Sequence, residues 1–272
     1  MQSMETTGFS DVDASGKSGE LVEYLIFLAD RMAQMRRQGL EMLNLEAGAA
    51  VLDVGCGVGE VCIELARRVR PDGRVAGIDL SEVMIRKARE LSTASGQEID
   101  FRVAGVQQLP FPDQFFDVVR AERLLQHLDD PEAALAEMAR VTRVGGQILL
   151  VDTEHGQWSM ALDRPDDRKV FEAVRRMLLR MVVNPHSGMR LRGMMQRFGL
   201  TDVRQLITVQ ELTLPDLRRA ILIDKLVAGC VDDGSITRDE ADAFVSSLEA
   251  RHHAGIFFAN SVMYSVIGRR RA

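Results

Sequence analysis

Short apolar runs alternate with helical patterns through the first half of the chain. Five runs have the length and composition of buried strands, and the segments between several of them repeat apolar residues every three or four positions. Strands that alternate with helices of about 10–15 residues are typical of βαβ units and of a parallel sheet. The predicted strands are 50–55, 74–79, 99–105, 116–122 and 147–153, and the predicted helices are 60–70, 82–95 and 131–143.

The pattern changes after residue 155, where helical segments predominate and two further strands are indicated. Thr237, with Glu240 three residues later, has the spacing of a capping box and predicts that a helix begins there. At the other end, residues 20–44 have helical apolar spacing, whereas residues 1–19 are polar and have no period. The later predicted helices are 166–182, 188–198, 215–230 and 237–252, and the strands are 203–212 and 257–268.

These elements predict an α/β fold, with a doubly wound, mostly parallel sheet of seven strands and helical additions. Residues 1–19 are expected to be a flexible leader. Residues 20–272 are expected to form one domain, whose core is 45–155 together with the two late strands. The helical additions are expected to form a lid over the carboxyl edge of the sheet, where open α/β folds bind ligands. They are the segments 20–44, 155–185 and 213–255.

Composition narrows the class of protein. The chain has 272 residues and a net charge of −6, which disfavours a nucleic-acid protein because neutralising phosphates needs a basic face. Its three cysteines, Cys56, Cys62 and Cys230, form no CxxC pair or metal spacing, so we expect no metal and a reducing cytoplasm. No apolar run reaches the ~18 residues that span a membrane, and no secretory signal is visible. The expected partner is a small molecule, and a homodimer stays open.

A glycine-rich loop follows the first predicted strand and opens the first helix. Its glycines, Gly55, Gly57 and Gly59, allow the backbone to turn sharply and to approach a ligand closely. Asp79 ends the next strand, at the spacing of about 20 residues at which an acidic side chain reaches ribose hydroxyls. The order G-x-G-x-G, with Asp53 two positions before it, differs from the G-x-G-x-x-G of nicotinamide and flavin sites. The loop therefore predicts a different nucleoside-containing cofactor, and a tight turn without a ligand is the alternative.

With these residues, the sequence resembles the class I S-adenosylmethionine-dependent methyltransferases, most of all the branch that acts on quinones, sterols and natural products. The resemblance covers about residues 45–155. It implies that Asp53 and the backbone of 55–59 hold the methionine part of S-adenosylmethionine. It also implies that Asp79 binds the ribose and that Leu80 packs on the adenine. The matching segments are LDVGCGVGE (52–60), GIDLS (77–81), LPFPDQFFDVV (109–119), LLQHLDDPEAALAEMARVTRVGG (124–146) and ILLVD (148–152).

Two parts of the implied cofactor site leave alternatives open. Where the family usually has Gly-Asp-Ala, this chain has Ala104-Gly105-Val106, so the acid that commonly meets the adenine amino group is absent. Gln107 or Gln108 could substitute, or the backbone of Val106 could suffice. Tyr24, on the N-terminal helix, could reach the cofactor carboxylate as lid tyrosines do in some relatives, or it could simply pack.

Methyl transfer requires alignment and exclusion of water, and it needs a base only if the acceptor must lose a proton. His127, after the fourth strand, is the first candidate for that base, and a structural histidine is the alternative. His155, after the fifth strand, is the second, and nearby Trp158 could form an aromatic wall or pack in a core. Arg123 could bind a substrate carboxylate or make a surface salt bridge. His186, in a polar loop, is a further substrate candidate.

The expected function is methyl transfer from S-adenosylmethionine to a small, fairly apolar acceptor, by direct displacement and without a metal. The resemblance implies O- or C-methylation in natural-product or quinone-like metabolism as the first expectation. Independently, 14 methionines against two tyrosines suit an adaptable apolar substrate pocket. An N-methyltransferase is the alternative in chemistry. A subunit of the same fold that binds the cofactor without catalysis is the alternative in class.

Overall fold

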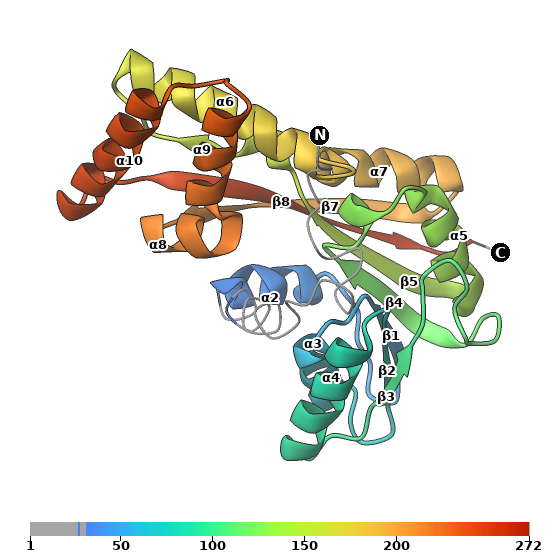
Figure 1. The fold of residues 1–272 in the computed structure, drawn as a ribbon. Coiled ribbons are helices and arrows are strands. Elements are labelled where there is room, and N and C mark those ends of the chain that lie inside the picture. The colour runs from blue at the N-terminus through green and yellow to red at the C-terminus, as the bar shows by residue number, and fades with distance from the viewer. Residues whose placement is uncertain (1–26, 28–30, 272) are drawn as a thin grey trace.

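One sheet forms the centre of the computed structural model, which describes residue 27 and residues 31–271. Helices cover both of its faces, and a further group of helices stands beyond one end (Figure 1). The strands are β1 (Ala50–Val54), β2 (Arg74–Asp79), β3 (Asp100–Val103), β4 (Phe116–Glu122), β5 (Thr142–Thr153), β6 (Ser159–Met160), β7 (Thr201–Leu212) and β8 (Ala259–Arg269). The helices are α2 (Ala33–Glu41), α3 (Glu60–Arg68), α4 (Glu82–Ala94), α5 (Pro131–Val141), α6 (Pro165–Met181), α7 (Ser187–Phe198), α8 (Leu214–Asp216), α9 (Ile223–Asp232) and α10 (Arg238–His253), with the short turns η1 (Leu125–His127), η2 (His155–Gln157) and η3 (Leu217–Ile221).

The strands run in the order β3-β2-β1-β4-β5-β8-β6, and β7 pairs with the other edge of β8. β1 to β5 pair in parallel, whereas β8 is antiparallel to β5, β6 and β7. The α/β prediction is thus confirmed, but the predicted number of seven strands is wrong for the described residues, which form eight. The additional strand, β6, continues beside β8 where β5 has ended. A two-residue strand has no period that a sequence could reveal.

Side chains of the central strands alternate between two cores. In β1, Val51 belongs to the core under α2, α3 and α4, whereas Leu52 belongs to the core under α5 and α7. Because both faces are covered, the central strands are almost continuously apolar, as is typical of buried parallel strands. Asp53 and Arg120 break this pattern, since both are charged and both are buried.

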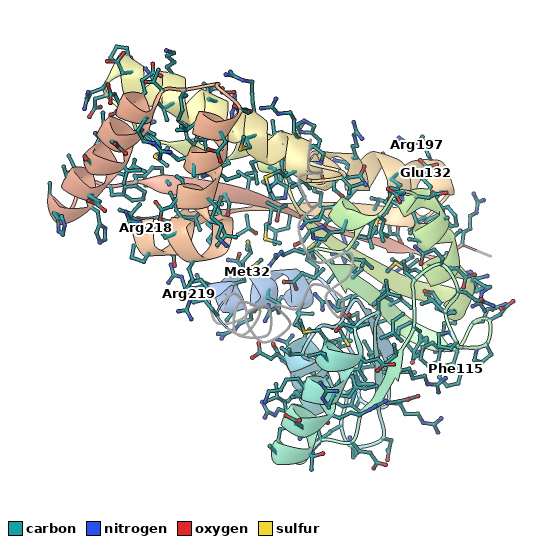
Figure 2. All side chains as sticks on the ribbon, in the orientation of Figure 1. Met32, Phe115, Glu132, Arg197, Arg218 and Arg219 are labelled. Atoms are coloured by element: carbon teal, nitrogen blue, oxygen red, sulfur yellow. The ribbon has the colours of Figure 1, made fainter. Side chains whose placement is uncertain are left out.

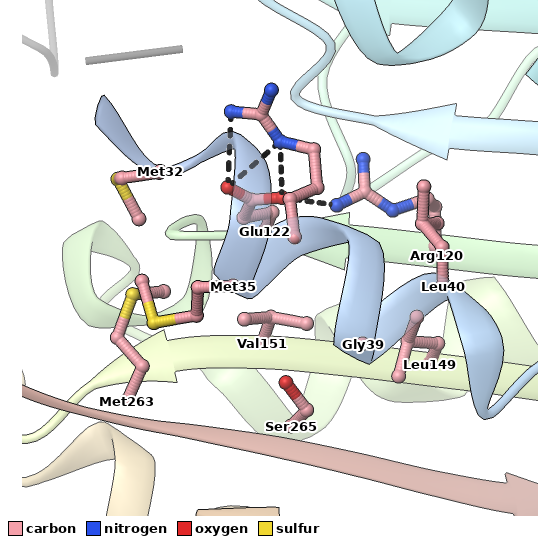
Figure 3. Close-up of a pocket in the computed structure, with 11 residues that line it drawn as sticks. Met32, Met35, Gly39, Leu40, Arg120, Glu122, Leu149, Val151, Met263 and Ser265 are labelled. Atoms are coloured by element: carbon pink, nitrogen blue, oxygen red, sulfur yellow. Dashed lines mark hydrogen bonds and ion pairs between the residues drawn. The ribbon is translucent and has the colours of Figure 1, made fainter. Parts of the chain in front are cut away.

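The described part of the predicted 20–44 helix is α2, and it lies on a face of the sheet, across β4, β5 and β8 (Figure 3). Met35 and Leu40 are buried there against the sheet. Gly39 permits the close approach, because a Cβ at this position would lie 3.2 Å from Ser265 Oγ. α2 therefore belongs to the layer that also contains α3.

The other helical additions, α6 and α8 to α10, share a core of their own beyond the carboxyl end of β5, at the upper left of Figure 1. The predicted single helix over 215–230 is wrong, because the segment is divided into α8, the π-helical turn η3 and α9. Leu222 separates the last two with a φ of +57°, a left-handed conformation that ends a right-handed helix. No glycine marks this break in the sequence. Closure of these helices over a ligand stays a prediction.

Candidate functional site

The glycine loop joins β1 to α3 in a conformation that glycine favours. Gly55, Gly57 and Gly59 have φ values of +73°, +52° and +76°. The N–H groups of Gly55 and Cys56 both donate to the carbonyl of Ile78 at 2.8 Å, which fixes the loop against the end of β2. A Cβ at Gly59 would come within 2.7 Å of the Phe101 ring. The loop is therefore fixed at the carboxyl edge of the sheet, and a side chain at Gly59 would not fit.

Asp79 connects this loop to the start of α4. Its Oδ2 accepts the N–H of Gly57 at 2.9 Å, and its Oδ1 accepts the N–H of Ser81 at 3.0 Å. Ser81 in turn caps α4, as predicted, by accepting the N–H of Met84 at 3.1 Å. The carboxylate thus lies between the glycine loop and a helix start, at the place where the sequence predicted a ribose ligand.

An apolar surface for an adenine ring lies beside Asp79. Leu80 is 64% exposed, the largest exposed fraction among the large hydrophobic side chains of the described residues. Gly105 faces it closely, since a Cβ there would lie 3.3 Å from Leu80 Cδ2 and 3.0 Å from Gln107 Oε1. Val106 is buried in the core, so only its backbone could meet a ligand. The residues present therefore fit an adenosine: an exposed apolar platform, an adjacent amide and a carboxylate.

A chain of buried charges runs beneath the loop. Asp53 is ion-paired with Arg120 at 2.8 Å, and Arg120 also donates to Glu122 Oε2 at 2.5 Å. Glu122 accepts in addition from Arg36 of α2 at 3.3 Å, as Figure 3 shows. Burial alone would raise the pKa of Glu122, but the guanidinium groups of Arg36 and Arg120 lower it to about 2. The Asp53 carboxylate is thus ion-paired with Arg120, so a cofactor group that contacts Asp53 must share the carboxylate with Arg120.

Arg120 is a site residue that the sequence analysis missed. The signal was a single cation inside the apolar strand FDVVRAE, because a buried arginine requires acidic partners. Its acidic partners are Asp53 of β1 and Glu122 of its own strand β4, and Glu122 in turn pairs with Arg36 of α2. A small cavity of about 10 Å³ lies next to this chain, between α2 and the sheet (Figure 3). That is room for about one water molecule.

Three histidines gather where β4 and β5 end. Gln126 lies between two of them, with its Nε2 2.9 Å from His127 Nε2 and its Oε1 3.4 Å from His155 Nε2. Burial, aided by the charge of Arg123, lowers the pKa of both His127 and His155 to about 4. Both rings are therefore neutral at pH 7 but bind a proton weakly, whereas an effective general base has a pKa near the working pH.

His186 has a different environment. Its Nδ1 is 2.6 Å from Oε1 of Glu154, whose side chain is fully buried, while the His186 side chain is 46% exposed. Asp152, two residues before Glu154, and Ser187, directly after His186, form a second pair: Ser187 Oγ donates to Asp152 Oδ2 at 2.6 Å. Burial raises the pKa of Asp152 to about 7. Sequence reasoning identified His186 but missed Glu154 and Asp152, which look like ordinary strand-end acids in the sequence.

Arg123 and Trp158, two further predicted substrate residues, both have neighbours within the protein. Arg123 has a φ of +54°, and its Nη1 is 3.7 Å from the sulfur of Met32 rather than in a surface salt bridge. Trp158 is buried in the core shared by α6 and α8 to α10, edge-on to Phe171 at 4.9 Å between ring centroids. This agrees with the packing alternative, and a contact with the substrate stays a prediction. Tyr24 lies outside the described residues.

A groove of about 510 Å³ lies between α5 and α7, with Leu125 of η1 among its lining residues. Glu132 and Arg197 meet across it at 3.3 Å (Figure 2). Met189 and Arg190, at the start of α7, are exposed on its wall. The groove has the volume of a small-molecule site.

Among residue 27 and residues 31–271, no helix is long and apolar enough to cross a membrane.

Comparisons with known proteins agree with this geometry. Residues 52–150 match the methyltransferase domain family. The chain is 35% identical over 119 residues to a demethylmenaquinone methyltransferase of Listeria monocytogenes, covering 43% of this chain and 50% of that protein. It is 31% identical over 157 residues to the ubiquinone/menaquinone biosynthesis C-methyltransferase UbiE of Bordetella avium, covering 53% of this chain and 61% of that protein. The chain thus spans about half the length of these curated relatives.

Among solved structures, the YcgJ protein of Bacillus subtilis superimposes with a TM-score of 0.58 at 22% identity, over 86% of this chain and 96% of that one. This likeness shows the fold. The fold, the glycine loop and the match of residues 52–150 to the methyltransferase domain family support the class that the sequence predicted, the class I S-adenosylmethionine-dependent methyltransferases. The cofactor of this class is S-adenosylmethionine, the one predicted.

Proposed function

We propose that the protein transfers a methyl group from S-adenosylmethionine to a small, fairly apolar acceptor. The observation that carries this proposal is the glycine loop, whose Gly57 N–H donates to the Asp79 carboxylate, inside residues that match the methyltransferase domain family. When bound, S-adenosylmethionine supplies an activated methyl group on a sulfonium sulfur. The protein's part is to bind the adenosine, to align the acceptor and to keep water away.

Five of the predicted cofactor residues have a role in this proposal. Asp79 binds the ribose hydroxyls, and Leu80 packs on the adenine, with Gln107 beside it in place of the missing acid. Gly55 and Gly57 present backbone to the methionine part of the cofactor. Asp53 contributes indirectly to the cofactor site, because its carboxylate is paired with Arg120.

For the acceptor we propose a quinol-like ring, methylated on carbon or oxygen. The relatives at 31–35% identity are quinone-pathway methyltransferases by name. Exposed Met189 and the groove between α5 and α7 offer an adaptable apolar surface near the end of β4. An N-methyltransferase, or a subunit that binds the cofactor without catalysis, are the alternatives, and a homodimer is compatible with each.

Binding and turnover separate these possibilities. Calorimetry with S-adenosylhomocysteine and with NAD should show binding of the first alone. Methyl transfer from radiolabelled S-adenosylmethionine should then be measured to reduced demethylmenaquinone and to a primary amine. Transfer to the quinol supports the proposal, and transfer to the amine alone supports the N-methyltransferase. Binding of S-adenosylhomocysteine without transfer to any acceptor would overturn methyl transfer as the function.

A further inference from the structure

We propose that His186, held by the buried carboxylate of Glu154, is the group that takes the proton from the acceptor. The inference rests on the proposed function and assigns a chemical role within the same site. It differs from the expectation that His127 or His155 is the base. The argument depends on which ring nitrogen of each histidine has a free lone pair.

The tautomer of His186 follows from its partner. Glu154 Oε1 accepts the N–H of Gly156 at 3.1 Å, and Glu154 Oε2 accepts the N–H of Met189 at 3.2 Å. A carboxylate that faces these donors acts as an acceptor, so the 2.6 Å contact requires the proton to be on Nδ1 of His186. In the neutral ring, Nε2 then has a free lone pair. Among the described residues, Nε2 has no hydrogen-bond partner, and nearly half of the side chain is exposed.

His127 and His155 are poorer candidates for different reasons. His127 Nε2 lies 2.9 Å from the Gln126 amide nitrogen, which can only donate, so the lone pair of this ring is engaged. His155 Nε2 faces the Gln126 amide oxygen at 3.4 Å and donates to it, so His155 keeps a lone pair on Nδ1. Burial lowers the pKa of His155 to about 4, however, so this lone pair is a weak base, whereas Nε2 of His186 belongs to a side chain that is nearly half exposed.

The loop that carries His186 is anchored at the carboxyl ends of two parallel strands. The N–H of Asn184 donates to Gln126 O of η1 at 2.9 Å, which fixes the loop to the end of β4. The N–H of His155 donates to Pro185 O at 3.0 Å, which fixes it to the end of β5. This edge is the one at which the glycine loop lies, so the imidazole is presented where an acceptor must meet the methyl group.

Gly156 makes room for the pair. A Cβ at this position would lie 2.6 Å from His186 Cε1 and 2.8 Å from Glu154 Oε1. The ring is thus packed against backbone on one side and open on the other. A buried acid that fixes the tautomer and orientation of a partly exposed imidazole is the arrangement by which acid–histidine pairs serve as bases.

The step balances without a further reactant. A new bond forms between the methyl carbon and a ring carbon or oxygen of the acceptor. The sulfur–methyl bond breaks, and its electron pair stays on sulfur, which leaves S-adenosylhomocysteine. The proton lost by the acceptor goes to Nε2 of His186, and Glu154 stabilises the imidazolium that results. His186 is the catalytic residue in this scheme, and Glu154 is a positioning residue.

The first test needs no acceptor. Histidine labelled with ¹⁵N, in the full chain at a pH at which its rings are neutral, reports which ring nitrogen carries hydrogen. The signal that disappears in His186→Gln belongs to this residue, and we expect it to show a protonated Nδ1 and an unprotonated Nε2. A protonated Nε2 on His186 would overturn the proposal.

The second test is turnover with reduced demethylmenaquinone. His186→Gln and Glu154→Gln should each lower the turnover rate ~10²–10⁴-fold, with the KM for the acceptor and the affinity for S-adenosylhomocysteine nearly unchanged. The matched control is His253→Gln, which removes an exposed histidine at the far end of α10. If the turnover rate of His186→Gln lies within about twofold of the wild-type rate, only this role of His186 is overturned. Wild type that binds S-adenosylhomocysteine but methylates no acceptor overturns the proposed function, and this role with it.

Discussion

Replacing Arg120 tests whether the buried chain of charges is required for stability. Its side chain is 2% exposed, and it pairs with Asp53 at 2.8 Å and with Glu122 at 2.5 Å. Arg120→Met keeps much of the side-chain volume but leaves Asp53 buried without its cation, whereas Glu122 retains Arg36. Breaking a buried pair from one side costs about 3–5 kcal/mol. That is a large part of the roughly 5–15 kcal/mol that typically separates folded from unfolded domains.

Urea unfolding measures this cost as a difference in the free energy of unfolding. Adding Asp53→Asn to the Arg120→Met variant should recover part of the loss, because a neutral amide is far cheaper to bury than an unpaired carboxylate. The control is Arg197→Met, whose pair with Glu132 is exposed on both sides and should be worth less than about 1 kcal/mol. The reasoning is refuted if Arg120→Met costs less than about 1 kcal/mol. It is also refuted if the double variant is no more stable than the single one.

Three further outcomes are expected. Asp79→Ala should weaken S-adenosylhomocysteine binding by about 1.5–3 kcal/mol, because a charge-assisted acceptor for the ribose is lost; unchanged affinity in calorimetry would contradict the assignment. Gly57→Val should give a folded protein, by circular dichroism, that no longer binds, since a branched side chain at a φ of +52° is strained and enters the ligand's space; normal binding would make the loop a mere turn. Burial raises the pKa of Asp152 from 3.8 to about 7, so the unfolded state ionises first and stability should fall between about pH 4 and pH 7. Asp152→Asn should remove this part of the slope when the Tm is followed across that range, and an unaltered slope would contradict the raised pKa.

Local sequence signals determined much of the fold. The alternation of apolar runs and helical patterns gave β1 to β5 and the helices between them within a few residues, because each element buries its own periodic face. Thr237 was predicted as a helix start, and its side chain accepts a backbone N–H of α10; Ser81 and Asp130 do the same for α4 and α5. The glycine loop was also recognisable from the sequence, because its three left-handed glycines and Asp79 lie in a short stretch with fixed spacing.

Contacts between distant segments were decided only by the tertiary structure. β6 forms because β8 extends beyond β5 and offers an edge for pairing. The division of the 215–230 segment at Leu222 is marked by no glycine or proline at that position. The charge chain needs α2, β1 and β4 to meet, and the pairing of Glu154 with His186 joins residues 32 positions apart. The sequence placed His127 first and His155 second as the base, and His186 only among the substrate candidates, because it could rank them by position alone. Ranking requires knowing which ring nitrogens are engaged and how far each ring is removed from water, and both depend on the neighbours that folding supplies.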